Sequence, residues 1–218
     1  MNLDGGNDPP ADEPYRGEDE LVRSIPLAGE LARGQAVVLG WPEPDELDRI
    51  TGLRNGPQTQ PWFLDRRTLD PEANRRFLSE GLAKPFESIL AVRWLQDGSF
   101  LGSIGWMDWR PAARKIALGR LMVDHKAVLA VGSRFPPGYQ GVAADAARTL
   151  GEFVFEVMKV RFISYCYLEQ NPRARRVAES GGLVVLDRRV ETTADGRRLV
   201  LIEARIPEES GGWLRGGG

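Results

Sequence analysis

The chain has 218 residues, 42% of them hydrophobic and 28% charged, with one Cys and one His. A single Cys excludes a disulfide within the chain, and zinc sites built from Cys and His need about three or four such ligands, so no metal site is expected. Lys and Arg total 29 against 31 Asp and Glu, a formal net charge of -2, which is unlike the basic surplus of a bulk nucleic-acid binder.

The two ends of the chain have the composition of tails. Gly, Pro, Asp, Glu and Asn dominate residues 1–30, and so little apolar surface cannot offset the entropy of ordering. No run reaches the roughly 18 apolar residues of a membrane helix, and the acidic N-terminus lacks the apolar core of a signal peptide. We expect a disordered tail over 1–30, one domain over 31–207, a flexible tail over 208–218 and a cytoplasmic location, with no membrane partner.

The first half of the domain mixes strand and helix signals. The apolar run 35–39 predicts a short strand, and the run from Pro44 to Asn55 predicts a helix. Asp70 as a cap, followed by a Pro, predicts a second helix that ends near Leu82. Three strand-like runs follow, over 89–95, 100–107 and 115–123. An Asp-Gly pair between the first two of these runs predicts a hairpin.

The second half begins with a long connection, 125–141, rich in Gly and Pro toward its end. The remaining predicted elements are a helix over 142–160, a strand over 162–168, a short helix from Pro172 to Ser180, and a hairpin of 183–191 with 197–206. We therefore expect an α/β fold. Its mostly antiparallel sheet has six to seven strands, flanked by about four helices and crossed by one central strand–helix–strand unit.

Three segments carry a family resemblance. They are LRNGPQTQPWFLDRRTLDPEANRRFL (53–78), ALGRLMVD (117–124) with GVAADAARTLGEFVFE (141–156), and YLEQNPRARRVAESGGL (167–183). Together they resemble the GNAT superfamily of N-acetyltransferases, and within it the bacterial ribosomal-protein and amino-sugar acetyltransferase branch. The resemblance implies a GNAT-like fold and the transfer of an acetyl group from acetyl-CoA to a primary amine.

The start of the helix at residue 142 has the features of an anion site. Its first N–H groups have no partner within the helix, the helix dipole favours negative charge, and small residues keep the approach open. The resemblance implies that this turn holds the pyrophosphate of coenzyme A and that the preceding strand pairs with the pantetheine arm. Arg176 or Arg173 is a candidate to bind the 3′-phosphate, because Arg is well suited to phosphate, and a solvated helix face is the alternative. The implied cofactor-binding residues are Leu121, Met122, Val123, Gly138, Tyr139, Gln140, Gly141, Val142, Ala143, Ala144, Asn171 and Arg176.

The chain departs from the family pattern at several positions. The motif Q/R-x-x-G-x-G/A, aligned on Gly141, begins here with Gly138. Three more positions differ: Ala117 stands where relatives often have Glu, Ala178 where many have a Tyr general acid, and Asn74 where the branch has His. These losses motivate a second hypothesis, a GNAT-fold protein that binds a ligand without catalysis.

Catalysis by this route requires the acceptor ammonium to lose a proton before it attacks. Asp124 and His125 follow the strand where amine and thioester would meet, and His titrates near neutral pH; the alternative is a solvated loop start. A Tyr hydroxyl, Tyr167 or Tyr165, is the candidate to protonate the leaving thiolate, the alternative being core packing, which we also expect for Cys166.

The acceptor is the least determined part of the prediction. Trp106, Asp108 and Trp109 end a strand where substrates of relatives often sit, and Trp62 lies in the aromatic-rich stretch; packing is the alternative for the Trp side chains. An amino sugar, a natural-product-like metabolite and a peptide or protein N-terminus remain open, and relatives are often homodimers. A third hypothesis changes the donor to a longer acyl-CoA or an aminoacyl-tRNA, because the connection 125–140 lies where the donor would bind.

Overall fold

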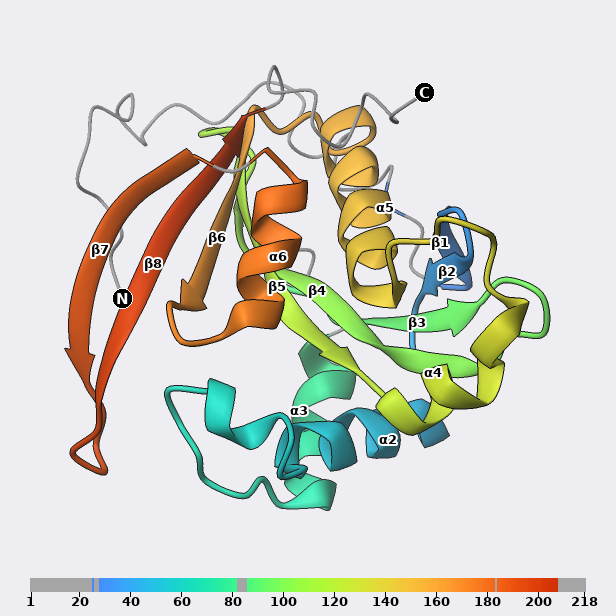
Figure 1. The fold of residues 1–218 in the computed structure, drawn as a ribbon, viewed down its shortest axis with the longest axis horizontal. Helices are drawn as coiled ribbons and strands as arrows, with labels where there is room; N and C mark the ends of the chain where they lie inside the picture. The colour runs from blue at the N-terminus through green and yellow to red at the C-terminus, as the bar shows by residue number, and fades with distance from the viewer. Residues whose placement is uncertain (1–24, 26–27, 82–85, 183, 208–218) are drawn as a thin grey trace.

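The computed structural model describes residues 25, 28–81, 86–182 and 184–207, which form one twisted sheet with helices on both faces (Figure 1). The strands are β1 (Glu30–Arg33), β2 (Val37–Gly40), β3 (Leu90–Trp94), β4 (Phe100–Arg110), β5 (Lys115–Val123), β6 (Phe162–Leu168), β7 (Val184–Thr192) and β8 (Arg198–Pro207). Their order is β1-β2-β3-β4-β5-β6-β8-β7, and every pair is antiparallel except β5 with β6. The mostly antiparallel α/β fold is confirmed, with eight strands rather than six to seven.

Five α-helices occur in the described residues, one more than predicted. They are α2 (Pro44–Asn55), α3 (Pro71–Gly81), α4 (His125–Val131), α5 (Val142–Glu156) and α6 (Pro172–Ser180), with the short 3-10 helices η1 (Gln60–Trp62) and η2 (Gly132–Arg134). None of the helices in this part of the chain is both long and apolar enough to cross a membrane.

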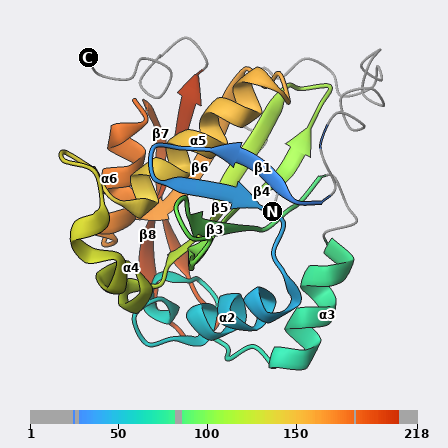
Figure 2. The same cartoon turned by 90° about the vertical axis from the view of Figure 1, so that its right-hand side faces the viewer.

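The helices cover opposite faces of the sheet because successive strand residues point to opposite sides. In β3, Val92 belongs to the large core under α5, whereas its neighbour Ala91 packs with Leu47 and Ile50 of α2. Figure 2 shows α5 and α6 on one side of the sheet and α2 with α3 on the other. A site between strands can therefore be approached from two separate helical layers.

Two elements were not predicted. Strand β1 pairs with β2 at the start of the domain; its sequence ELAR carries no alternation that would mark a strand. Helix α4 occupies the start of the predicted connection. The Asp124 side chain accepts hydrogen bonds from two backbone N–H groups of its first turn, and Gly132 ends it, so its capping signals were present in the sequence.

Other predicted boundaries moved or lie outside the described residues. The longest helix ends at Glu156 rather than at residue 160. Most of the predicted tails, 1–30 and 208–218, lie outside the described residues, so they stay predictions. One described residue of the first segment, Ile25, is buried in the main core.

The central crossover sets up the site. The chain leaves β5, forms α5, and returns as β6 parallel to β5. Pairing runs only from Lys115 with Phe162 to Leu118 with Tyr165, although β5 continues to Val123 and β6 to Leu168. The two strands thus diverge beyond their last pair, and a wedge opens in the middle of the sheet.

Candidate functional site

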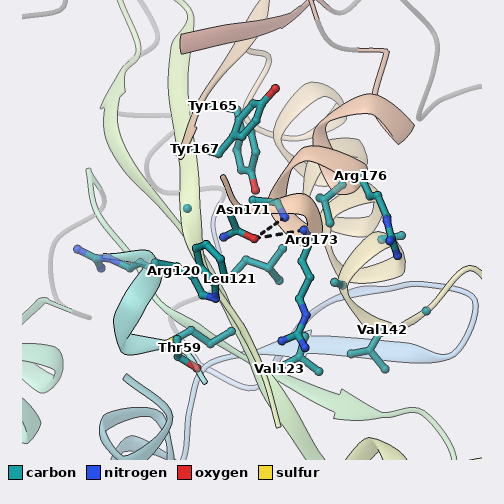
Figure 3. A pocket seen from close by; sticks show the side chains of 18 of the residues that line it. Thr59, Arg120, Leu121, Val123, Val142, Tyr165, Tyr167, Asn171, Arg173 and Arg176 are labelled. Carbon is teal, nitrogen blue, oxygen red and sulfur yellow. Dashed lines mark hydrogen bonds between the residues drawn. The ribbon is translucent and has the colours of Figure 1, made fainter. Parts of the chain in front are cut away.

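A cavity of about 580 Å³ occupies this wedge (Figure 3). The diverging ends of β5 and β6 form two walls, and the starts of α5 and α6 close it on one side of the sheet. The segment around η1 contributes Gln58, Thr59, Trp62 and Phe63 from the α2 layer. The cavity therefore connects the two helical layers through the gap in the sheet.

The strand edge in the cavity has unused backbone groups. Beyond Leu118, the side of β5 that faces β6 has no strand partner among the described residues. Leu121, Met122 and Val123 all line the cavity there. The bulge residue Arg120 has a positive φ of 55°, and pairing with β4 skips from Gly119 to Met122. Backbone donors and acceptors on this edge are free to bind an extended ligand, as an added strand would.

The start of α5 faces the same cavity. Gly141 precedes the helix with φ 107° and ψ 157°, a conformation that is open essentially only to glycine, and no side chain caps the helix. Residues 140–144 line the cavity, and Ala143 and Ala144 among them are small. The first N–H groups of α5 therefore present an anion site at the mouth of the wedge.

A buried carboxylate fixes this helix start. Asp145 is only 4% exposed, and it accepts from the backbone N–H groups of Gln35 (3.0 Å) and Ala36 (2.8 Å) in the β1–β2 turn. It also accepts from the Tyr139 hydroxyl at 3.2 Å and from the Arg148 guanidinium at 2.9 Å. Burial raises the pKa of Tyr139, which keeps the hydroxyl a donor. The helix start is thus tied to a hairpin far away in the sequence.

Two predicted cofactor residues lie outside the cavity lining. Gly138 and Tyr139 do not line the cavity; the Tyr139 ring stacks on Phe135 at 4.7 Å between centroids, and its hydroxyl bonds Asp145. The other predicted cofactor residues, Leu121–Val123, 140–144, Asn171 and Arg176, all line it.

Asn171 opens α6 and serves as its cap. Its side-chain oxygen accepts from the N–H groups of Arg173 and Ala174, both at 3.2 Å, as the dashed lines of Figure 3 show. The amide nitrogen of the same side chain is not used in this cap, so it is left to donate toward the cavity.

His125 and Arg173 both line the cavity, and their side chains contact each other. Its Nε2 is 2.8 Å from an Arg173 guanidinium nitrogen, and since a guanidinium only donates, Nε2 accepts. Burial, and then the positive charge of Arg173, lower the pKa of His125. The lowered pKa favours the neutral imidazole, and Arg173 occupies the lone pair of Nε2.

Asp124 does not share this environment. Its carboxylate accepts from the Lys126 and Ala127 N–H groups, both at 3.1 Å, and lies 3.5 Å from Arg49. It does not line the cavity. As a cap, it holds the α4 helix whose first residue is His125.

Two tyrosines of β6 line the cavity side by side. The rings of Tyr165 and Tyr167 lie 5.9 Å apart between centroids, and Tyr167 packs against Ala178 of α6. Burial raises the pKa of Tyr165 to about 12 and also raises the pKa of Tyr167. Both hydroxyls are therefore protonated donors near neutral pH. Cys166 between them is exposed and lines the cavity, which corrects the expectation of core packing.

Only one of the four predicted acceptor residues lines the cavity. Trp62 lines the cavity. Trp106 and Trp109 are buried in the main core, at 0% and 2% exposure, and Asp108 pairs with Arg110 at 2.9 Å outside the cavity lining. Aromatic residues at a strand end suit a core as well as a site, and here the core takes them.

The neighbours of Trp62 in this wall carry no sequence signal that predicts a site. Gln58, Thr59 and Phe63 belong to the segment between α2 and α3. Arg197 from the β7–β8 hairpin donates to the Phe63 and Leu64 carbonyls at 3.4 and 3.2 Å and so holds this segment. Within the described residues, no group of three or more His, Cys, Asp or Glu side chains is placed to hold a metal ion.

Comparisons with solved structures show a shared fold. The acetyltransferase (GNAT family) from Bacillus anthracis matches with TM-score 0.66 and 14% identity, over 82% of this chain and 98% of that chain. A GCN5-related N-acetyltransferase from Brucella melitensis matches with TM-score 0.65 and 19% identity, over 85% and 81%. A spermidine N-acetyltransferase from Vibrio cholerae in complex with CoA and spermine matches with TM-score 0.69 and 15% identity, over 83% and 99%.

Comparisons of sequence give the family. The chain has no significant match among curated proteins. The model of the "Acetyltransferase (GNAT) domain" family matches residues 37–184, which include the strand wedge, the helix start at Gly141 and the Asn171 cap. The chain therefore belongs to the GNAT acetyltransferase family.

Proposed function

We propose that this protein transfers an acetyl group from acetyl-CoA to a primary amine. The observation that carries the proposal is the wedge between β5 and β6, with a free strand edge beside an uncapped helix start. These two features suit the two halves of one elongated ligand: an amide-containing arm and a diphosphate. The family match supports the same chemistry.

Different residues would bind different parts of the proposed cofactor. The edge of β5 at Leu121–Val123 would hold the pantetheine arm, with the Asn171 amide on its other side. The N–H groups at the start of α5 would bind the diphosphate. Arg176 and Arg173 also line the cavity and would bind a further phosphate. When bound, acetyl-CoA supplies an electrophilic thioester carbonyl.

The amine must lose a proton before it attacks, and a side chain of this protein would accept it. His125 lines the cavity and has the side chain suited to accept a proton near neutral pH, and we propose it as the base, with Asp124 as its positioning residue. Its Nε2 is occupied by Arg173. An Arg173 side chain that turns to a phosphate would release this nitrogen.

The departing sulfur needs a hydrogen-bond donor. We propose the Tyr167 hydroxyl, because Tyr167 packs against Ala178, the position at which many relatives carry a Tyr. Its raised pKa keeps the proton in place until charge develops on the sulfur.

Further proposals rest on the sequence and the family alone. An amino sugar or another small metabolite, or a protein N-terminus, is the acceptor that the ribosomal-protein and amino-sugar branch suggests. A homodimer, a cytoplasmic location, and a single domain over 31–207 between two tails belong to the same set.

Two measurements test the proposal: coenzyme A binding first, and then turnover of acetyl-CoA with an amine. Coenzyme A at about 100 times its Kd should stabilise the fold by about 2.7 kcal/mol by mass action, seen as a higher unfolding midpoint. No shift at millimolar coenzyme A would overturn the proposal. Thiol release from acetyl-CoA with an amine panel then tests catalysis. A longer acyl-CoA that turns over faster would favour the alternative donor, and binding without turnover would favour a non-catalytic protein.

A further inference from the structure

We infer that the acceptor is a primary amine on an aromatic or apolar body with no second cationic group, and that polyamines are poor acceptors. This inference rests on the proposed function and deepens it. Its basis is the charge and the chemistry of the cavity wall that the η1 segment forms. The polyamine complex of one fold neighbour does not transfer to this chain at 15% identity.

The described residues of the acceptor wall carry no negative charge. Gln58, Thr59, Trp62 and Phe63 are neutral, Arg120 is a cation, and no Asp or Glu is among the described residues that line the cavity. A polyamine carries several ammonium groups, and each one that leaves water needs a carboxylate or a comparable partner. An acceptor with a single amine, neutral when it attacks, needs none.

The carboxylate next to this wall is already committed. Glu87 lies outside the lining, and its side chain accepts from the Arg120 guanidinium at 2.9 Å. Arg120 also donates to the Ser88 carbonyl at 3.0 Å, and its side chain is only 21% exposed. The Arg120 charge offsets the Glu87 charge, so this pair adds no net negative charge that would attract a polycation.

The wall offers apolar and neutral contacts instead. Trp62 is half-buried and lines the cavity beside Phe63, whose ring lies against the Arg54 guanidinium at 3.7 Å. Gln58 and Thr59 add neutral polar groups. One indole face attracts an exposed ammonium only weakly, whereas it suits stacking with an aromatic body. The chemistry of this wall thus favours an aromatic or apolar amine over a polycation.

The experiment compares two amines on one enzyme. At saturating acetyl-CoA, kcat/KM for 2-phenylethylamine should exceed that for spermidine by at least about tenfold, the worth of one charged hydrogen bond. Trp62→Ala should raise the KM for 2-phenylethylamine more than the KM for spermidine. A spermidine kcat/KM equal to or above that of the aromatic amine would overturn the inference.

A designed gain of function sharpens the test. Thr59→Asp places a carboxylate on the acceptor wall, and Thr59→Asn is its neutral control of equal size. The Asp variant should raise kcat/KM for spermidine by roughly tenfold over the Asn variant. Equal values in the two variants would count against the inference, because charge would then not limit polyamine use.

Coenzyme A binding distinguishes a failure of the proposed function from a failure of the inference about the acceptor. If coenzyme A does not bind, the proposed function fails. If it binds and spermidine is preferred, or if it binds and neither amine is acetylated, the inference about the acceptor fails while the cofactor site stands.

Discussion

The same two strands, β5 and β6, build both a closed core and an open site. Over the first four pairs they are hydrogen-bonded, and Ile116 and Ile163 of this half have 0% exposure. Beyond Leu118 and Tyr165 the strands separate, and their residues line the cavity. The closed half contributes apolar burial, and the open half contributes unpaired backbone groups.

The difference teaches that this site depends on backbone geometry more than on reactive side chains. A bulge at Arg120 and an uncapped helix start at Gly141 create binding groups from the backbone, without a reactive side chain. Stability and ligand binding should therefore respond to different substitutions, even within one strand pair.

The largest expected effect is on the closed half. Ile163→Ala removes a fully buried side chain paired with Ile116 and should lower the free energy of unfolding by about 2–5 kcal/mol. Denaturant unfolding measures it. Coenzyme A affinity of the folded fraction should change less than about threefold; a collapse of affinity with little loss of stability would break the comparison.

The open half should show the opposite pattern. Gly141→Asp places a carboxylate at the helix start and should weaken coenzyme A binding by about 100-fold or more, measured by calorimetry. Any side chain at φ 107° carries strain of about 1–3 kcal/mol. Gly141→Ala is therefore the control, with the same strain but no charge. Equal affinity in the two variants would place the phosphate elsewhere.

A smaller effect is expected on turnover alone. Tyr167→Phe removes the proposed donor to the departing sulfur and should lower kcat about tenfold, with coenzyme A affinity unchanged. Tyr165→Phe, on the same strand, is the matched control. A loss in the Tyr165 variant and none in the Tyr167 variant would reverse the assignment.

The smallest effect is a pH dependence. Burial and Arg173 lower the pKa of His125 in the folded protein, so the unfolded chain binds more protons at that residue. Its contribution to stability is present above the unfolded pKa of about 6.5 and is lost as pH falls through the folded pKa. Arg173→Gln should raise the pKa of His125. Since the chain has one His, its NMR titration is unambiguous, and an unchanged pKa would remove Arg173 as a cause.

Local signals were enough to predict the elements that form the proposed cofactor site. The strands 115–123 and 162–168 and the Asn171-Pro172 helix start have the predicted bounds, because alternation, caps and glycines act within a few residues. Helix α4 was missed although Asp124 and Gly132 mark its two ends; the Gly-Pro stretch that follows it dominated the prediction.

The proposed acceptor wall could not be predicted in the same way. Thr59 and Phe63 lie in an irregular segment whose place depends on Arg197, more than 130 residues away. No local pattern encodes such a contact. The position of Trp106 and Trp109 at a strand end predicts a substrate role or core packing, and the structure buries both side chains in the core.

The carboxylate of Asp145 links the proposed diphosphate site to amides far away in the sequence. It accepts from the amides of Gln35 and Ala36, which are 110 and 109 residues away in sequence. Their protons exchange with solvent only when those hydrogen bonds open. Two amides of an edge hairpin thus report on the start of α5, so a ligand that rigidifies this start slows their hydrogen exchange without touching the hairpin.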